Sequence, residues 1–229
     1  MKDRILVVGL GNPGDKFTNT RHNAGYMFLD YLVRGHYSNI KHDSNWKYSK
    51  KLEGDFIKLT LDENLELILL KPTTYMNNSG RSVSKASKWF EINIEKNLFV
   101  AYDDLDLVLG KIKIRRSGPR VHNGVSDIIK SLNTKKFIHI RIGTDNRDTK
   151  QRNNQSGCDY VLGKFTKIEL EKLQNSFPEI VNHDQWRSVL AKHKRTKDDG
   201  SESQNKLLIT ANAKADQSNT NSNLGTRKS

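Results

Sequence analysis

The sequence has very little cysteine, because Cys158 is the single cysteine in 229 residues. One cysteine cannot form an internal disulfide or a zinc site built from several cysteines, and it suits a reducing compartment, so we expect a cytoplasmic protein. The N-terminus also lacks a long hydrophobic run, since only residues 5–8 are consecutively apolar before a glycine. That run is too short for a signal peptide or a membrane span, which predicts a protein that is neither exported nor membrane-bound.

Acidic residues are too few to balance the basic ones. The chain has 39 Lys and Arg against 26 Asp and Glu, a formal net charge of +13. The excess is concentrated in residues 111–152, which contain twelve basic and three acidic residues. Such a segment is typical of proteins that bind a phosphate backbone with salt-dependent affinity. From charge alone, a protein that is merely basic and soluble remains the alternative.

Hydrophobic periodicity predicts alternating strands and helices. Apolar or alternating runs predict strands at residues 5–8, 46–52, 55–61, 65–70, 98–102, 111–115 and 137–142. Apolar residues at helical spacing predict helices that start near Ala24, include residues 83–90 and 125–132, and run on from Thr166 to Ile180. This order predicts a single α/β domain with a mixed, mostly parallel central sheet flanked by helices on both faces.

The remaining segments are less regular. Residues 144–156 are polar and rich in turn-forming residues, which predicts a surface loop, and residues 161–165 form a short apolar segment that we expect to be packed. From residue 193 to residue 229 the chain is dominated by Ser, Asn, Gln and Lys without sustained periodicity. We therefore expect a domain of residues 1–192 followed by a flexible tail, in which the apolar cluster 207–209 is the one candidate for docking.

Polar side chains follow three of the predicted apolar strands. Asn12, Asn77 and Asp103 come after the strands at 5–8, 65–70 and 98–102. If these strands are parallel neighbours, the three side chains share one rim, where open α/β sheets bind their ligands. The loop that contains Asn12 leads to His22 at the start of the first helix, so both side chains can point into one crevice. We take this crevice as the predicted active site.

Two other interpretations of the motifs are weaker. Residues 9–14 formally match the dinucleotide fingerprint G-x-G-x-x-G after a strand. However, no helical period begins at Gly14, and the acidic residue expected about 20 positions later at the end of a second strand is missing. A serine esterase is disfavoured because the sequence lacks the G-x-S-x-G nucleophile motif.

Six spaced motifs together resemble one known family. The segments GLGNPG, TRHNAG, KPTTYMNNSG, DDLDL, HNG and DYVLGKF occur in this order, and over residues 4–181 the chain resembles the bacterial-type peptidyl-tRNA hydrolase family. The resemblance implies hydrolysis of the ester that joins a peptide to tRNA in peptidyl-tRNA, which recycles tRNA from aborted translation. It also implies a monomer that binds the acceptor stem and 3′ end of tRNA and needs neither cofactor nor metal.

The resemblance assigns roles to individual residues. His22 is implied as the catalytic base, Asp103 as its orienting partner, and Asn12 as part of the catalytic group. Phe17 replaces a tyrosine that the family has near the terminal adenosine, and Met76 is expected mainly to pack. The implied substrate-binding residues are Phe17, Tyr75, Met76, Asn77, Asn123, Arg115 and Arg141, of which the two arginines would grip tRNA phosphate.

These residue types suit ester hydrolysis independently of the resemblance. Histidine is the side chain whose ordinary pKa lets it act as a base near neutral pH, and a carboxylate can hold the imidazole and stabilise its charged form. Asparagine amides can donate to a developing oxyanion without ionising, and they can also accept from a peptide N–H. Such a site would prefer N-acylated substrates over free aminoacyl-tRNA.

Several alternatives stay open at this level. His122 could be the base instead of His22, Asp104 or Asp106 could replace Asp103, and Asn77 and Asn123 could be left-handed turn residues. The alternative function is a noncatalytic RNA-binding relative on the same scaffold. It is motivated by residues 119–121, which replace a glycine-rich family loop, and by the extra C-terminal tail. Separately, residues 144–146 replace the usual glycine and proline, which suggests a remodelled tRNA-facing rim.

Overall fold

The computed structural model describes residues 2–40, 45–119 and 121–192 of the chain. Residues up to Val189 belong to one compact unit. The predicted tail of residues 193–229, with its apolar cluster at 207–209, lies outside the described residues, as does Arg120. Among the helices that are described, none has both the length and the apolar character needed to cross a membrane.

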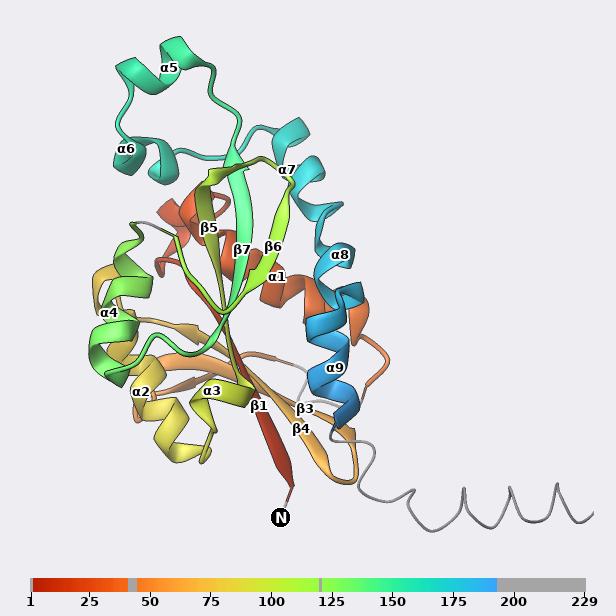
Figure 1. Ribbon diagram of the computed structural model, residues 1–229. Helices are drawn as coiled ribbons and strands as arrows, with labels where there is room; N and C mark the ends of the chain where they lie inside the picture. The colour runs from red at the N-terminus through yellow and green to blue at the C-terminus, as the bar shows by residue number, and fades with distance from the viewer. Residues whose placement is uncertain (1, 41–44, 120, 193–229) are drawn as a thin grey trace, which may run out of the picture. The chain divides into compact units, whose positions relative to one another are not determined.

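The described residues form a seven-stranded sheet in the order β2-β3-β4-β1-β5-β7-β6 (Figure 1). The strands are β1 (Asp3–Gly9), β2 (Lys47–Ser49), β3 (Gly54–Asp62), β4 (Leu65–Pro72), β5 (Leu98–Val108), β6 (Ile112–Arg115) and β7 (Ile138–Asp145). The four central strands β4, β1, β5 and β7 are parallel, whereas β2, β3 and β6 pair antiparallel with their neighbours. The mixed, mostly parallel sheet that the sequence predicts is therefore confirmed.

Helices cover both faces of the sheet (Figure 1). One face carries α2 (Ser79–Trp89), α3 (Ile94–Asn97) and α4 (Asn123–Leu132), and the other carries α1 (Ala24–Tyr31), α7 (Lys167–Gln174), α8 (Phe177–Asn182) and α9 (Asp184–Lys192). Two short helices, α5 (Thr149–Asn154) and α6 (Gly157–Leu162), follow the end of β7. Short turns of helix also occur at η1 (Asp15–Phe17), η2 (Arg21–Asn23), η3 (Leu32–His36) and η4 (Met76–Asn78).

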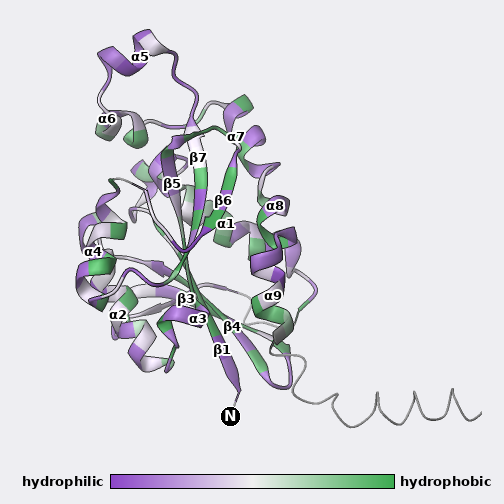
Figure 2. Cartoon of the chain, viewed as in Figure 1, coloured by the Kyte–Doolittle hydropathy of each residue, from purple (hydrophilic) through white to green (hydrophobic). Residues whose placement is uncertain are grey.

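The central strands are apolar because both of their faces are covered. On one face, Leu6, Val8 and Tyr102 belong to the core formed with α2 and α4. On the other face, the ring of Trp186 from α9 lies 5.2 Å from that of Phe99 on β5 and 6.0 Å from that of Phe28 on α1, measured between centroids. Outside this core, α5 is hydrophilic along its whole length (Figure 2).

Two glycines allow elements near the strand ends to approach closely. A Cβ atom added at Gly25 would lie 2.3 Å from the carbonyl oxygen of Ala101, so α1 can start directly against β5 only with glycine there. A Cβ atom at Gly80 would lie 2.3 Å from the carbonyl oxygen of Asp127, so α2 and α4 can touch. The first contact holds the start of α1 against β5, and the second holds the start of α2 against the middle of α4.

Four details of the predicted elements are wrong. β2 is shorter than residues 46–52, and β5 continues past Tyr102, so Asp103 lies inside a strand rather than after it. The single helix predicted from Thr166 is two helices, because α7 ends at Gln174 and Pro178, which has no N–H, lies in the first turn of α8. The predicted loop at 144–156 contains the end of β7 and α5, whose start is fixed by a capping box between Asp148 and Gln151.

Candidate functional site

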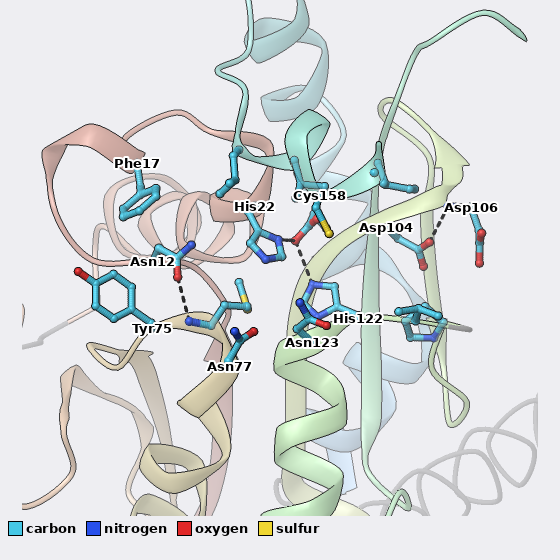
Figure 3. Close-up of a pocket in the computed structure, with 18 residues that line it drawn as sticks. Asn12, Phe17, His22, Tyr75, Asn77, Asp104, Asp106, His122, Asn123 and Cys158 are labelled. Atoms are coloured by element: carbon cyan, nitrogen blue, oxygen red, sulfur yellow. Dashed lines mark hydrogen bonds and ion pairs between the residues drawn. The ribbon is translucent and has the colours of Figure 1, made fainter. Parts of the chain in front are cut away.

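A cavity of about 720 Å³ lies at the carboxyl ends of the central strands (Figure 3). Because β4, β1 and β5 are parallel neighbours, Asn12 and Asn77, which follow β1 and β4, line this cavity together with Asp103, which lies within β5. The cavity brings together most of the residues predicted for the site, namely Asn12, Phe17, His22, Tyr75, Met76, Asn77, Asp103 and Asn123.

The two predicted phosphate-binding arginines lie outside this cavity. Arg115 is on the exposed side of β6, next to the likewise exposed Lys113. Arg141 on β7 is engaged inside the protein, because its guanidinium pairs with Asp104 and also lies 3.6 Å from Asp106, and its side chain is only 14% exposed. The charge of Arg141 is thus largely compensated by carboxylates, whereas that of Arg115 faces solvent.

Three titratable side chains form a hydrogen-bonded group, here called the catalytic cluster: His22, Asp103 and His122. The Nδ1 atom of His22 lies 2.8 Å from Oδ1 of Asp103, and Nε2 of His122 lies 3.0 Å from the same oxygen. His22 lies in η2 and Asp103 lies in β5, whereas His122 is the N-cap residue of α4. Asp103 is 2% exposed, so its carboxylate is stabilised by hydrogen bonds from these histidines rather than by water.

The hydrogen bonds distinguish the two histidines of this cluster. The backbone N–H of Val125 donates to Nδ1 of His122 at 3.3 Å, so a neutral His122 carries its proton on Nε2 and donates it to Asp103. Both nitrogens of His122 are therefore occupied. His22 uses Nδ1 toward Asp103, which leaves its Nε2 as the nitrogen available to a water molecule. The alternative with His122 as the base is disfavoured.

The same contacts shift the pKa values of the pair. Burial by itself would lower the pKa of His22, but the charge of Asp103 and its hydrogen bond outweigh this and hold the pKa above the ordinary 6.5. Burial would raise the pKa of Asp103, but the two histidines hold it well below its usual range. Asp103 is therefore ionised, and His22 is a stronger base than a free histidine.

The catalytic cluster also has the composition of a metal site, since its possible ligand atoms lie within 4.8 Å of one another. A histidine that binds a metal normally donates its other ring N–H to a nearby acceptor. With a metal on Nε2, His122 would carry its proton on Nδ1, where the Val125 amide already donates. The donor set therefore suits proton transfer better than metal binding.

Asn12 is fixed with its amide nitrogen free to donate. Its Oδ1 accepts from the backbone N–H of Met76 at 2.8 Å, which leaves Nδ2 to face the cavity (Figure 3). The backbone of Asn12 is clamped by Asn23, whose side chain exchanges hydrogen bonds of 2.9 and 3.0 Å with it. Sequence reasoning missed this role of Asn23, although Asn23 directly follows His22.

Asn77 and Asn123 line the cavity from helical turns. Asn77 lies in η4 and Asn123 is the first residue of α4, and both side chains are exposed to the cavity. The alternative that they are left-handed turn residues is wrong, because among the described non-glycine residues positive φ angles occur at Asn19, Glu53, Glu91 and Asn133. Met76 is 4% exposed and both packs and lines the cavity.

The cavity has an aromatic end and an apolar wall. At one end, the rings of Phe17 and Tyr75 meet edge to face with centroids 6.4 Å apart, while Asp106 lies at the other end (Figure 3). The wall includes residues that sequence reasoning did not assign to the site: Leu105, Pro119, Val121, Cys158, Val161 and Leu162. Three of them lie in motifs that the sequence analysis named: Leu105 in DDLDL, and Val161 and Leu162 in DYVLGKF.

Comparisons with known proteins agree with this geometry. The family model described as Peptidyl-tRNA hydrolase matches residues 6–206. Proteins named peptidyl-tRNA hydrolase from Oceanobacillus iheyensis and Clostridium botulinum are each 42% identical to this chain, over 75% and 78% of it and 85% and 86% of their own lengths. The crystal structure of peptidyl-tRNA hydrolase from Acinetobacter baumannii superposes with a TM-score of 0.67 at 28% identity, covering 84% of this chain and 93% of that one.

Proposed function

Since the chain belongs to the peptidyl-tRNA hydrolase family, it hydrolyses the ester bond between peptide and tRNA in peptidyl-tRNA, and we propose that His22 is the general base of this reaction. The observation that carries the proposal is the 2.8 Å contact between His22 Nδ1 and Asp103 Oδ1. It orients the ring with Nε2 available for water, and it raises the basicity of that nitrogen.

In the proposed reaction, His22, Asp103 and Asn12 act on the ester and on a water molecule. Nε2 of His22 takes a proton from water as the oxygen attacks the ester carbonyl, and Asp103 stabilises the resulting imidazolium. Nδ2 of Asn12 donates to the oxyanion that forms on the carbonyl oxygen, a type of contact worth about 2.7–4 kcal/mol elsewhere. The bond to the ribose oxygen breaks, and His22 returns the proton to that leaving oxygen.

The two ends of the cavity suit the two parts of the substrate. Phe17 and Tyr75 offer ring faces and edges for the terminal adenine of tRNA. The apolar wall that includes Val161 suits peptide side chains, and the amides of Asn77 and Asn123 suit the peptide backbone. A free aminoacyl group would place a charged amine where an amide is expected, so N-acylated substrates are preferred.

The acceptor stem is bound by charge rather than by the cavity. Lys113 and Arg115 project from the same exposed side of β6, and we call this pair the basic edge. Their positions on an edge strand leave both cations open to a phosphate backbone. A cytoplasmic location, a monomeric state and independence from metal remain predictions from the sequence.

Release of labelled peptide from peptidyl-tRNA tests this function, with unblocked aminoacyl-tRNA as the control substrate. We expect rapid release of the peptide and little hydrolysis of the control. The competing function is a noncatalytic RNA-binding relative, which would bind both tRNAs and release neither amino acid nor peptide. Retention of the tRNA without release would therefore reject the hydrolase.

A further inference from the structure

The ring of Tyr160 on α6 contacts two guanidinium groups. The Cζ atoms of Arg21 and Arg147 each lie 4.2 Å from its centroid. Such stacked cations are attracted by the electron-rich face of the ring, most strongly where water is excluded. Tyr160 and Arg21 are buried, and the side chain of Arg147 is 8% exposed. The three side chains therefore form a desolvated unit, here called the Tyr160 stack.

Arg147 is locked into the stack by a buried carboxylate. Its Nε and Nη2 atoms lie 3.0 Å from the two oxygens of Asp145, and its Nη1 donates to the carbonyl of Gln155 at 3.0 Å. Burial would raise the pKa of Asp145, but the hydrogen bonds from Arg147 outweigh it and lower the pKa, so the carboxylate is charged. A bidentate pair of this kind fixes the plane of the guanidinium.

The hydroxyl of Tyr160 is fixed as well. It donates to the side-chain oxygen of Asn146, whose amide nitrogen donates to Glu169 at 2.7 Å. Glu169 in turn accepts from Arg21 at 2.9 Å. The ring and the hydroxyl of Tyr160 are thus joined to Arg21 by two separate routes.

Arg21 connects this unit to the catalytic cluster, because it directly precedes His22 in η2. Its backbone N–H donates to the carbonyl of Gly163 at 3.0 Å, and its Nη1 donates to that of Lys164 at 3.0 Å. The turn that carries His22 is therefore bonded to the residues that follow α6. Meanwhile α6 itself lines the substrate cavity through Gly157, Cys158, Val161 and Leu162.

We infer that Arg147 is a positioning residue: through the Tyr160 stack it holds α6, one wall of the cavity, in register with the turn that carries His22. The inference rests on the proposed function. It also gives a role to Asp145 and Asn146, which belong to the segment 144–146 where the sequence departs from its family and which do not line the cavity. Arg147 contacts neither His22 nor Asp103, so it acts on the fit of the substrate rather than on proton transfer.

The test compares Arg147→Met with Arg152→Met. Arg152 also approaches Asp145, at 3.4 Å, and it donates to the backbone carbonyl of Arg147 at 3.2 Å. It is a matched control because its side chain is 51% exposed, whereas the cations over the Tyr160 ring are Arg21 and Arg147. The substrate is a minimal N-acetyl-aminoacyl ester of adenosine, which contains no phosphate, so neither arginine can affect its hydrolysis through a phosphate contact. Arg147→Lys is a second variant, in case Arg147→Met does not fold. It keeps a positive charge next to Asp145 but loses the planar guanidinium that stacks on Tyr160.

We expect Arg147→Met to raise KM about tenfold, with a smaller change in kcat and no shift in the pH midpoint of kcat. The KM of Arg147→Lys should lie between that of Arg147→Met and that of wild type. Hydrogen exchange of the α6 amides should accelerate in Arg147→Met and not in Arg152→Met. Equal KM values and equal exchange in the two methionine variants would overturn the inference. If wild type fails to hydrolyse the ester and peptidyl-tRNA, the proposed function fails, while the exchange measurement still decides whether Arg147 holds α6.

Discussion

The catalytic cluster and the basic edge hold their charges in opposite ways. In the catalytic cluster, the carboxylate of Asp103 is buried and fixed by two hydrogen bonds from histidines. On the basic edge, Lys113 and Arg115 are exposed on an edge strand. Buried, bonded groups depend on exact geometry, whereas exposed cations act through charge and are screened by salt. Chemistry and tRNA affinity should therefore respond to different substitutions.

The largest effect is expected in the catalytic cluster. His22→Ala removes the only described nitrogen in the cluster that is free to take a proton from water, so we expect kcat to fall by about 10²–10⁴-fold. The affinity for uncleaved tRNA should stay unchanged, because the basic edge is untouched. Single-turnover peptide release and a tRNA binding titration measure the two quantities.

His36→Ala is the matched control for this substitution, because His36 is exposed and its ring meets that of Tyr37 edge to face instead of lining the cavity. His36→Ala should leave both kcat and the affinity for uncleaved tRNA as in wild type. If His22→Ala retains the wild-type rate of peptide release, His22 is not the base. The catalytic cluster would then not be the region on which the chemistry depends.

A smaller effect is expected at His122, which supports the cluster without receiving the proton. His122→Ala leaves the Val125 N–H and one side of Asp103 without a partner, so unfolding should become easier by about 1–2 kcal/mol and kcat should fall about tenfold. His122→Asn keeps an acceptor for the helix cap and an N–H donor, so it should recover part of both losses. A denaturant titration measures the free energy of unfolding, and steady-state kinetics measure kcat. If kcat falls as far in His122→Ala as in His22→Ala, His122 is as important for catalysis as His22.

The smallest effect is expected on the basic edge. Arg115→Glu should weaken tRNA binding about tenfold and reduce its salt dependence by about one phosphate contact, while a minimal N-acyl-aminoacyl ester is hydrolysed as before. The measurement is tRNA affinity over a range of salt concentrations, alongside hydrolysis of the minimal ester. Equal losses on tRNA and on the minimal ester would show that Arg115 supports the fold instead.

Arg141→Glu sharpens the same comparison, because the Arg141 side chain is mostly buried and paired with a carboxylate, unlike the exposed cations of the basic edge. The substitution would place a third carboxylate beside Asp104 and Asp106. We therefore expect it to lower stability by about 3–5 kcal/mol, the cost of breaking a buried ion pair. A melting temperature equal to that of Arg115→Glu would contradict this distinction.

Sequence patterns predicted the sheet well because its central strands are buried on both faces and read as continuous apolar runs, as in residues 65–70. They also predicted that Asn12, Asn77 and Asp103 share a rim, which follows from parallel pairing. The same patterns failed at α5, where hydrogen bonds of a helix cap rather than hydrophobic periodicity start the helix. The polarity of residues 149–154 suggested a loop, yet the capping box at Asp148 starts α5 there.

The finer parts of the site could not be predicted because they depend on contacts between distant residues. Nothing in the sequence around His122 indicates that the Val125 amide fixes its proton on Nε2, or that His22 and His122 share one oxygen of Asp103. Likewise, the pairing of Arg141 with Asp104 depends on the register between β5 and β7. The family resemblance therefore gave Arg141 and Arg115 the same role, although the structure surrounds them differently.

The pH dependence of kcat/KM in wild type and in Asp103→Asn tests the pairing of His22 with Asp103 most directly. Because the base must be neutral, activity should rise with pH, with a midpoint above 6.5 in wild type since Asp103 raises the pKa of His22. Without that charge, burial alone acts on His22, so Asp103→Asn should move the midpoint to lower pH while lowering the plateau. A midpoint that stays in place in Asp103→Asn would contradict the account.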